Sequence, residues 1–388
     1  MLGEVAHVSI GRTPPRGKPQ YWTTDLTLPF CTIADMTSKD IDPAREGVTP
    51  AAERDGKAKR VPAGALLMSF KLTIGKIGFA SRDIFPNEAI AWLRVTDDRL
   101  DAHFLALVLE AQDLTVDSGR AVKGSTLNSK SLHNIPIRFP ILGEQRRIVD
   151  LIGALDAQIE ALEFEEQACT AMLATLRREY LEPLDGTVVL TSVMSKVMSG
   201  GTPSRKRPDF YGGDIPWLKS GEIASPQILC TEEKITDEAL AGSSTWIAPA
   251  GAVVVAMYGA TAAEVGFLGA PMATNQAVLA MVPNKDRCDG RFAYHWFCLH
   301  SPRLKAAASG AAQPNLSKAV ILREMGYPAL GRDEQSRIGQ LLDAPLAMAT
   351  FLRQEAEALR AARMAALGEL LSGAVEIPES YDALLESV

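Results

Sequence analysis

Apolar residues recur along residues 148–180 at spacings that alternate between four and three. This stripe is interrupted only at Glu166 and comprises Ile148, Ile152, Leu155, Ile159, Leu162, Cys169, Leu173, Leu176 and Tyr180. A heptad stripe needs a second helix to cover it, so the pattern predicts one helix of a coiled coil. About 33 helical residues, at ~1.5 Å each, would form a rod roughly 50 Å long.

A second stripe follows 190 positions later. Its seam positions are Ile338, Leu342, Pro345, Ala349, Leu352, Ala356, Leu359, Arg363, Ala366 and Leu370. Because small residues stand here where the first stripe has large ones, we expect the two helices to pack closely against each other as an intramolecular coiled coil. Pro345 is expected to kink the second helix or displace its start. Two independent amphipathic surface helices are the alternative interpretation.

Outside these stripes, short apolar runs bounded by Gly and Pro predict mixed α/β domains. Buried strands are expected at residues 65–70 and 252–257, and short helices at residues 103–112 and 291–300. Two strands marked by proline are expected to follow, at residues 135–140 and 325–328.

The predicted elements occur twice because the chain is a tandem duplication. Four anchors recur in the same order at offsets of 187 to 190: GRTPPR at 11 and GGTPSR at 200, VPAG at 61 and APAG at 248, NEA at 87 and NQA at 275, and EQRRI at 144 and EQSRI at 334. We therefore expect five segments: domain 1 at 1–142, a long helix at 143–184, domain 2 at 185–330, a second long helix at 331–372, and a C-terminal segment at 373–388.

The C-terminal segment resembles the residues that open the second repeat, with Gly373 matching Gly186. No such segment precedes the first domain in the sequence. We therefore expect residues 373–388 to pack beside domain 1 and to close a pseudo-twofold ring.

The formal charge of −7 argues against a nucleic-acid partner only if the charge is evenly spread. The net charge is +2 over residues 1–142, −5 over 143–184, +1 over 185–330 and −5 over 331–388. The acidity therefore lies on the predicted helices, and basic clusters lie in domain loops beside aromatic residues. Such loops can place cations on phosphates and amphipathic side chains at base edges.

Several functional classes find no support in the sequence. A composition of 47% hydrophobic and 22% charged residues is typical of a globular protein, without a membrane-spanning run or a secretory signal. Five cysteines without a CxxC motif fit a reducing cytoplasm. P-loop, dinucleotide, HExxH and GxSxG motifs are absent from the sequence. His295, Cys298 and His300 do not share one helix face, which favours a packed aromatic helix over a metal site.

Each repeat opens on Gly-x-Thr-Pro-x-Arg and enters its long helix through a proline followed by Glu-Gln-x-x-Ile. The second repeat also contains Ile215-Pro216-Trp217 and Ser220-Gly221-Glu222-Ile223, where the first has Pro29-Phe30 and Asp35-Met36. In these motifs, and over its whole length, the chain resembles the DNA-specificity subunits of type I restriction-modification systems.

The resemblance implies an α+β fold with two pseudo-twofold-related α/β target-recognition domains, joined by two long helices that form an antiparallel coiled coil. Each domain would read one half of a bipartite double-stranded DNA site. The helices would set the spacing and dock two modification subunits, which bind S-adenosylmethionine and methylate adenine N6. A separate restriction subunit can join such complexes. This chain itself is expected to be a non-catalytic cytoplasmic protein, with no cofactor, metal or membrane partner of its own.

Candidate DNA contacts follow from the positions of these motifs. In the first domain they are Arg12, Thr13, Arg16, Lys18, Tyr21, Lys71, Lys123, Ser125, Thr126, Asn128 and Lys130. In the second domain they are Thr202, Ser204, Arg205, Lys206, Lys219, Ser220, Tyr258, Gln313, Asn315, Ser317 and Lys318. Ordinary surface-turn chemistry is the alternative for each residue. For Glu144, Gln145, Glu334 and Gln335 we favour a structural role at the helix start over contact with a partner.

Two other functions are left open at this point. The first is a coiled-coil protein-interaction scaffold with protein-binding end domains, and DNA affinity that falls steeply with salt would exclude it. The second is an enzyme with an unrecognised active site. Purified chain that neither methylates nor cuts DNA in the presence of S-adenosylmethionine and Mg²⁺ would argue against an enzyme.

Overall fold

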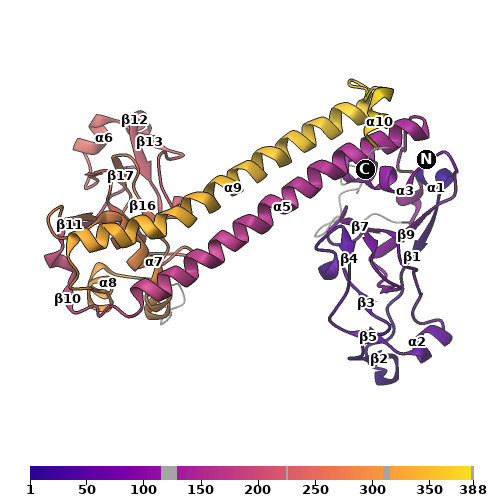
Figure 1. Ribbon diagram of the computed structural model, residues 1–388, viewed down its shortest axis with the longest axis horizontal. Coiled ribbons are helices and arrows are strands. Elements are labelled where there is room, and N and C mark those ends of the chain that lie inside the picture. Colours follow the sequence, from indigo (N-terminus) through magenta and orange to yellow (C-terminus); the bar gives the residue numbers. More distant parts are fainter. Residues whose placement is uncertain (115–128, 224–225, 309–314, 386–388) are drawn as a thin grey trace. The chain divides into compact units, whose positions relative to one another are not determined.

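The computed structural model describes residues 1–114, 129–223, 226–308 and 315–385 (Figure 1). The chain divides into two compact units. The first unit holds Met1–Glu160 with Glu357–Val388, and the second holds Ala161–Ala356. Each unit combines one mixed α/β domain with parts of two long helices, α5 (Leu142–Leu181) and α9 (Arg332–Ser372). The α+β class with two such domains is thereby confirmed.

The domain of the first unit is built on a five-stranded sheet. Its strands are, in spatial order, β1 (Ala6–Ile10), β9 (Ile90–Val95), β6 (Leu66–Ser69), β7 (Ile77–Ala80) and β4 (Asp40–Ile41). Neighbours run antiparallel except β4, which is parallel to β7. The buried strand expected at residues 65–70 is β6, and the expected helix is α3 (Ala102–Ala111). Phe104 and Leu105 of α3 join Leu66 and Met68 in the core.

The domain of the second unit repeats this sheet. Its strands are, in spatial order, β11 (Met194–Ser199), β18 (Val278–Pro283), β15 (Val253–Ala256) and β16 (Val265–Phe267). A parallel bridge between Ile228 and Leu268 takes the place of the β4–β7 pair. The helix expected at residues 291–300 is α7 (Gly290–Ala308), which continues past Pro302 because Leu304 and Ala308 pack into the same core.

Short strands form a smaller layer in each domain. In the first, β2 (Trp22–Thr23) pairs with β5 (Gly47–Val48), and β3 (Phe30–Cys31) pairs in parallel with β8 (Phe85–Pro86). In the second, β12 (Tyr211–Leu218) pairs with β13 (Lys234–Ile235) and, in parallel, with β17 (Met272–Thr274), beside β14 (Ile247–Ala248). Phe30 pairs with Phe85 in the first domain, and Trp217 pairs with Ala273 in the second. Trp217 stands 187 positions after Phe30, and Ala273 stands 188 positions after Phe85, so the duplication extends to strand register.

The remaining elements are short. They are α1 (Leu2–Val5), η1 (Pro19–Tyr21), η2 (Ile33–Asp35), α2 (Pro50–Arg54), α4 (Ser129–His133), β10 (Val188–Val189), η3 (Leu190–Ser192), η4 (Pro208–Phe210), η5 (Ser220–Glu222), α6 (Asp237–Ala241), α8 (Lys318–Glu324), β19 (Gly326–Tyr327), η6 (Glu379–Tyr381) and α10 (Asp382–Leu385). The strand expected at residues 325–328 is β19, which pairs with β10. The strand expected at residues 135–140 does not form, since Pro136 and Pro140 have no N–H to donate to a ladder.

Within each unit the parts of α5 and α9 run antiparallel. In the first unit, Asp156 of α5 receives hydrogen bonds from Arg363 of α9, and in the second Glu166 receives one from Arg353. The predicted seam side chains are all buried or half-buried: Ile148, Ile152, Leu155, Ile159, Leu162, Leu173, Leu176, Ile338, Leu342, Leu352, Leu359 and Leu370. Ala349 and Ala356 are buried between them.

The expectation that Pro345 displaces the start of the second helix is wrong, because α9 begins at Arg332 and continues through Pro345. Proline removes one backbone hydrogen bond from the helical ladder. In a helix of 41 residues, whose Leu342 and Ala349 are buried on either side of the proline, packing outweighs that loss.

The segment after α9 belongs to the first unit. Ile377 is buried in the same core as Leu2 and Ile135. Beyond it, the Tyr381 hydroxyl donates to Asp150 at 2.6 Å, and Asp382 pairs with Arg147. Leu190, which stands 187 positions before Ile377, is buried in the corresponding core of the second unit. The core of the first unit thus contains Ile377 from the C-terminal segment, and the core of the second unit contains Leu190 from the start of the second repeat.

Candidate nucleic-acid interface

The Gly-x-Thr-Pro loop is anchored in the same way in both domains. The amide of Gly11 donates to the carbonyl of Ile90 at 3.0 Å, and that of Gly200 donates to the carbonyl of Val278 at 3.3 Å. A Cβ on Gly11 would lie 2.2 Å from the backbone oxygen of Pro86, and one on Gly200 would lie 1.8 Å from that of Thr274. Only glycine allows the backbone to approach this closely.

The arginine that ends this motif is clamped to a glutamate in each domain. Arg16 donates to both oxygens of Glu46, at 2.6 and 2.7 Å, and its guanidinium lies 3.7 Å from the ring centroid of Trp22. Arg205 likewise donates to both oxygens of Glu233, at 2.7 and 3.1 Å, and lies 4.3 Å from the ring of Tyr211. The hydrogen bond from Arg205 is the main cause that lowers the pKa of Glu233 to about 2.

This clamp gives Arg16 and Arg205 a positioning role. A bidentate pair stacked on an aromatic ring holds the loop in one conformation. The side chains are still 56% and 55% exposed, so the outer edge of each guanidinium faces solvent. These two predicted DNA contacts are therefore held in place by the fold with one edge free.

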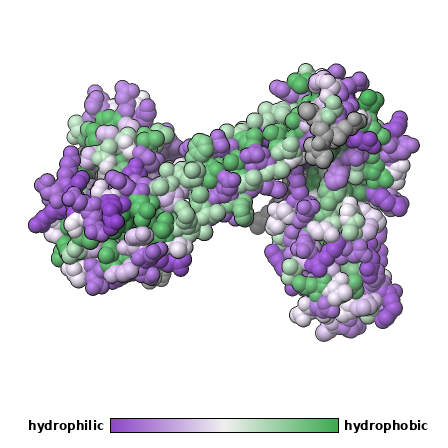
Figure 2. All heavy atoms as spheres, in the orientation of Figure 1, coloured by the Kyte–Doolittle hydropathy of each residue, from purple (hydrophilic) through white to green (hydrophobic). Residues whose placement is uncertain are grey.

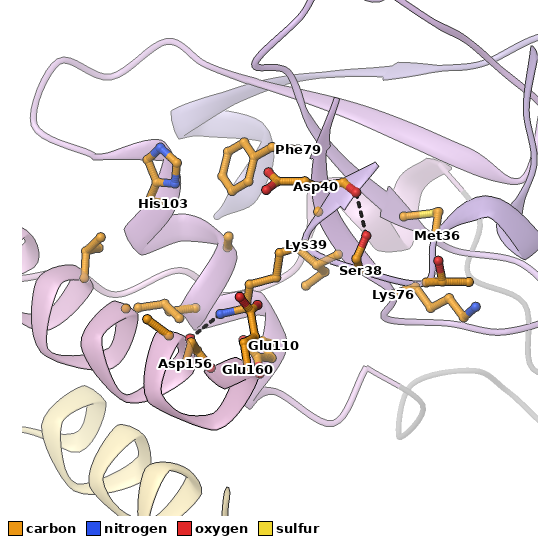
Figure 3. A pocket seen from close by; sticks show the side chains of 18 of the residues that line it. Met36, Ser38, Lys39, Asp40, Lys76, Phe79, His103, Glu110, Asp156 and Glu160 are labelled. Atoms are coloured by element: carbon orange, nitrogen blue, oxygen red, sulfur yellow. Dashed lines mark hydrogen bonds and ion pairs between the residues drawn. The ribbon is translucent and has the colours of Figure 1, made fainter. Parts of the chain in front are cut away.

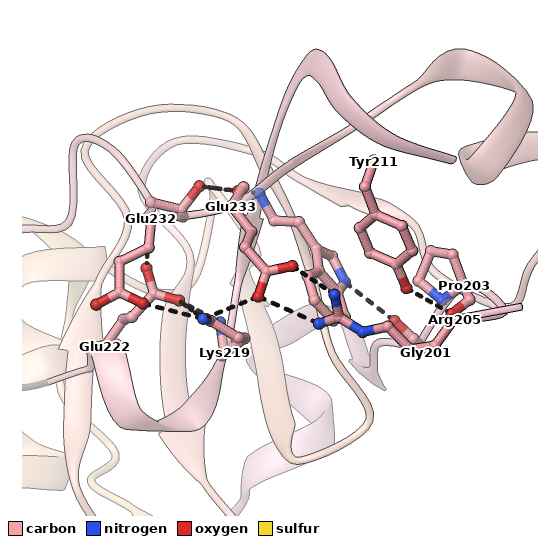
Figure 4. Close-up of polar contacts among 10 residues, drawn as sticks. Gly201, Pro203, Arg205, Tyr211, Lys219, Glu222, Glu232 and Glu233 are labelled. Carbon is pink, nitrogen blue, oxygen red and sulfur yellow. Dashed lines mark hydrogen bonds and ion pairs between the residues drawn. The ribbon is translucent and has the colours of Figure 1, made fainter. Parts of the chain in front are cut away.

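Lys219 differs from the free cation that the motif suggested. Its ammonium lies 3.0 Å from Glu232, 3.1 Å from Glu233 and 3.8 Å from Glu222 (Figure 4). Three carboxylates around one ammonium leave no net positive charge to attract a phosphate. Hydrogen bonds from Lys219 to Glu232 and Glu233 accordingly raise its pKa. Lys219 therefore serves the internal structure of the loop, beside the Arg205 clamp.

Tyr21 is also corrected from a base contact to a packing residue. Its side chain is 5% exposed and lies in a small core with Phe30, Val48 and Phe85. Its hydroxyl donates to Asp55 at 2.9 Å. An aromatic residue next to a basic loop suggested contact with base edges. The small core at this position instead buries an aromatic ring, which is Phe210 in the second domain.

Four predicted contacts of the second domain do lie close together. Tyr258 forms a backbone bridge with Asn315, and the amide of Leu316 donates to the carbonyl of Met257. Ser317 caps α8 by accepting from Val320, and Lys318 donates to the carbonyl of Val197. The side chains of Tyr258, Asn315, Ser317 and Lys318 are exposed, so they form one polar surface beside the β15–β16 loop.

The other predicted contacts are dispersed over several loops and short helices. Arg12 donates to the carbonyl of Gly56, and Lys71 lies 5.2 Å from the ring of Phe70. Lys18, Lys130, Ser204 and Lys206 are exposed, and Ser220 is half-buried at the start of η5. Thr13 donates to Glu88, and Thr202 donates to Gln276. Five predicted contacts lie outside the described residues: Lys123, Ser125, Thr126, Asn128 and Gln313.

Two exposed side chains in this loop system, Glu88 and Gln276, are not among the predicted contacts. Each accepts a hydrogen bond from the motif threonine, Thr13 in the first domain and Thr202 in the second. The signal was present in the sequence, because Asn87-Glu88-Ala89 and Asn275-Gln276-Ala277 are one of the repeat anchors. The anchor establishes the duplication, but only the fold shows that it lies against the Gly-x-Thr-Pro loop.

Comparison with known families identifies the duplicated unit. The type I restriction modification DNA specificity domain matches residues 1–168 and again residues 187–359. The chain belongs to this family. The two matches correspond to the two repeats, and the resemblance seen in the sequence motifs is confirmed.

Two curated relatives support the assignment to the specificity family. The type I restriction enzyme MjaIX specificity subunit of Methanocaldococcus jannaschii is 29% identical over 168 residues, which cover 41% of this chain and 38% of that protein. The EcoR124I/EcoR124II specificity subunit of Escherichia coli is 26% identical over 238 residues, which cover 57% of each. The matched region thus spans 38% and 57% of these relatives.

A solved structure shows the same fold over a longer stretch. The S subunit of a type I restriction-modification system from M. genitalium is 12% identical, has a TM-score of 0.62, and is matched over 95% of this chain and 94% of that one.

The first unit of this chain contains a cavity of about 610 Å³ where β4 and β7 meet α3 and α5 (Figure 3). Lys39 forms an ion pair with Asp156. Asp156 also accepts a hydrogen bond from Arg363 at 2.6 Å, and Arg363 donates a second hydrogen bond to Glu110 at 2.8 Å. Burial raises the pKa of Asp156, but hydrogen bonds from Arg363 and Lys39 outweigh it and leave that pKa below its ordinary value. The central charges of this cavity are thus paired with one another.

A cavity of about 430 Å³ stands in the second unit at the corresponding place, beside Arg291, Asp343 and Leu346. In the part of the chain that the structure describes, no three His, Cys, Asp or Glu side chains are grouped so that they could hold a metal ion. Nor does any helix within the described ranges have the length and apolar character needed to cross a lipid bilayer.

Proposed function

We propose that the chain is the non-catalytic DNA-recognition subunit of a type I restriction-modification system. Each domain reads one half of a bipartite double-stranded target. One observation carries the proposal: the same loop scaffold recurs in both domains, with the Arg16–Glu46 clamp matched by Arg205–Glu233, while exposed positions around it differ. A common framework with different exposed side chains is what two different half-sites require.

Cations that remain accessible support contact with DNA. Lys18, Lys206 and Lys318 are exposed on domain loops or at a helix start, and Lys71 is half-buried on the loop after β6. Side chains of this kind bind phosphates without reading sequence, and they fix the register of a protein on the duplex. We expect the acidic long helices to avoid the spacer DNA between the half-sites, because their carboxylates repel phosphates.

Exposed apolar side chains on the long helices support the docking of partner subunits (Figure 2). In the second unit, Phe164 is 73% exposed, and Met172, Met348 and Phe351 are about half-exposed. Large apolar side chains that remain exposed on a helix are typical of surfaces that bind other helices. We propose that two adenine-N6 methyltransferase subunits dock on the long helices and that they, rather than this chain, bind S-adenosylmethionine. Where a restriction subunit exists, it joins this complex in the cytoplasm.

A domain exchange tests the proposal directly. Residues 1–142 are replaced by those of a relative with a different target, and the chain is expressed with its modification subunits. Because Leu367, Leu370 and Ile377 pack in the core of this domain, the donor must keep apolar residues facing them. We expect only one half of the methylated sequence to change, as read by methylome sequencing. A change in both halves, or in neither, would contradict the proposal.

Two measurements separate the proposal from its alternatives. DNA affinity of the purified chain is measured between 50 and 200 mM salt, where several phosphate contacts predict a steep fall. A protein-interaction scaffold would show weak, salt-insensitive binding. The purified chain is also incubated with DNA, S-adenosylmethionine and Mg²⁺, and methylation or cleavage without partners would identify it as an enzyme.

A further inference from the structure

Glu88 and Gln276 lie on the same turn of the two domains. The turn follows β8 in the first domain, where the amide of Ala89 donates to the Asn87 side chain at 3.0 Å and the amide of Ile90 donates to the Asn87 carbonyl at 3.2 Å. It follows β17 in the second domain, where the amide of Ala277 donates to the Asn275 side chain at 3.0 Å and the amide of Val278 donates to the Asn275 carbonyl at 3.2 Å. These matching bonds fix one backbone conformation, so the two side chains leave it at equivalent points.

Both side chains are exposed and both are oriented by the motif threonine. The hydroxyl of Thr13 donates to Oε2 of Glu88, and that of Thr202 donates to Oε1 of Gln276. The threonine occupies only one lone pair of each acceptor. Glu88 retains its second oxygen as an acceptor, and Gln276 retains two N–H donors and a remaining lone pair on its oxygen.

The neighbouring loop also belongs to the predicted interface. The amide of Phe70 donates to the carbonyl of Ala89, so Lys71 follows directly beside the Glu88 turn. The amide of Met257 donates to Ala277 in the same way, which places Tyr258 beside the Gln276 turn. The hydrogen bond from Thr13, with the charges of Lys71 and Arg16, lowers the pKa of Glu88, so this carboxylate is ionised. The turn therefore lies between the Gly-x-Thr-Pro loop and the β6–β7 or β15–β16 loop.

We propose that Glu88 and Gln276 are equivalent base-reading residues, each of which determines one position of its half-site. A carboxylate only accepts hydrogen bonds, so Glu88 selects a base with an amino group in the major groove, cytosine N4 or adenine N6. An amide both donates and accepts, so Gln276 selects adenine through N6 and N7. The scaffold around them is the same, and the group presented to the base differs.

Thr13 and Thr202 are positioning residues in this arrangement. Their hydroxyls hold the reading side chains in one rotamer without touching the base. Loss of the hydroxyl should weaken discrimination at that position while leaving the preferred base unchanged.

The experiment uses the full chain and a pool of DNA duplexes randomised in both half-sites, from which bound sequences are recovered and counted. Variants are Glu88→Gln, Gln276→Glu, Thr13→Val and Thr202→Val. Matched controls are Asp98→Asn, an exposed carboxylate of the first domain, and Gln340→Glu, an exposed amide on α9. Thermal unfolding of each variant reports whether the domain has kept its structure.

We expect Glu88→Gln to change the relative enrichment of bases about tenfold at one position of the first half-site, and to leave the second unchanged. Gln276→Glu should do the same in the second half-site only. Each valine variant should flatten the preference at the position of its partner. The controls should leave all positions unchanged.

This inference rests on the proposed function, and the outcomes distinguish the two. If the natural chain recovers no preferred sequence, the proposed function fails. If it recovers a bipartite sequence but the glutamate and glutamine variants change only overall affinity, the base-reading assignment is wrong while the proposed function stands. A shift of both half-sites by one substitution would also overturn the assignment.

Discussion

Gln145 and Gln335 make the same buried contacts in their two units. Gln145 accepts from the amide of Asp101 and donates to the carbonyls of Arg99 and Pro140, at 2.7 to 2.8 Å. Gln335 accepts from the amide of Asp289 at 3.0 Å and donates to the carbonyls of Arg287 and Leu330. The glutamine of the Glu-Gln-x-x-Ile motif thus joins the start of a long helix to the start of α3 or α7.

Substitution of Gln335 by Ala should therefore destabilise the second domain by about 3 kcal/mol, because buried amides and carbonyls are left without partners. The Tyr327 hydroxyl, which donates to Gln335 at 2.8 Å, also loses its acceptor. Thermal unfolding measures the effect. Gln340→Ala, at an exposed position of the same helix, is the control and should change the melting temperature little. Equal melting temperatures for both variants would contradict the structural role.

Arg205→Lys should remove the bidentate pair with Glu233 while keeping the positive charge at this position. Lysine keeps the positive charge but cannot form the bidentate pair with Glu233 or stack as a plane on Tyr211. We expect a loss of about 1 kcal/mol in stability, since the pair is half-exposed, and an unchanged salt dependence of DNA binding. Lys206→Ala should show the reverse, unchanged stability with weaker DNA binding. If Arg205→Lys instead leaves the thermal stability unchanged, the bidentate pair with Glu233 does not stabilise the loop.

Acidification should destabilise the second domain through His295. This side chain is fully buried, accepts from Arg177 at Nδ1 and lies 3.1 Å from Asp343 at Nε2. Burial lowers its pKa below the ordinary 6.5, and Asp343 offsets only part of that effect. Below pH 6.5 the unfolded chain therefore binds a proton that the folded chain does not, so stability falls until the pH reaches the folded-state pKa.

The measurement is the free energy of unfolding between pH 7 and pH 5, for the natural chain and for His295→Leu. Leucine is the residue at the matching position of the first domain, Leu107, which is also buried. The variant starts from a lower stability, because Arg177 loses its acceptor, but its pH dependence in this range should be flatter. Parallel curves for the two proteins would show that His295 does not carry the effect.

Arg363 should be essential to the first unit, since it is a buried cation at a seam position. It is 6% exposed and donates to both Glu110 and Asp156. Arg363→Leu leaves Glu110 without its arginine and Asp156 with only Lys39, and we expect a loss of about 3 kcal/mol in urea unfolding. Adding Glu110→Gln and Asp156→Asn should recover part of that loss. Arg337→Leu, which breaks an exposed pair with Glu334, is the control and should cost less than about 1 kcal/mol.

Local periodicity was enough to predict much of the architecture. The heptad stripe from Ile148 and its repeat from Ile338 correspond to α5 and α9, because an amphipathic helix is specified by residues three and four apart. The apolar runs that became β6 and β15 were likewise recognisable. The repeat anchors implied a shared fold, since the same local sequences form the same local structures.

Predictions failed where a distant partner was needed. The run at residues 135–140 has strand character but two prolines, and no neighbouring strand pairs with it. Pro345 was expected to kink the second helix or displace its start, and the start is not displaced, because packing on both sides of the proline keeps the helix continuous. In both cases the local sequence preference was real, but tertiary contacts determined whether the predicted strand or helix break formed.

The sequence established that the chain is a tandem duplication with basic loops and with the motifs of the specificity family, because motifs, charge segregation and repeats are all readable along one dimension. The fold established which of those basic and polar side chains are available. Lys219 is surrounded by three carboxylates and Tyr21 is buried, whereas Glu88 and Gln276 are presented at the surface by a threonine about 75 positions away. Ion pairing and burial depend on residues far apart in the chain, which is why local pattern could not sort structural charges from those free to meet DNA.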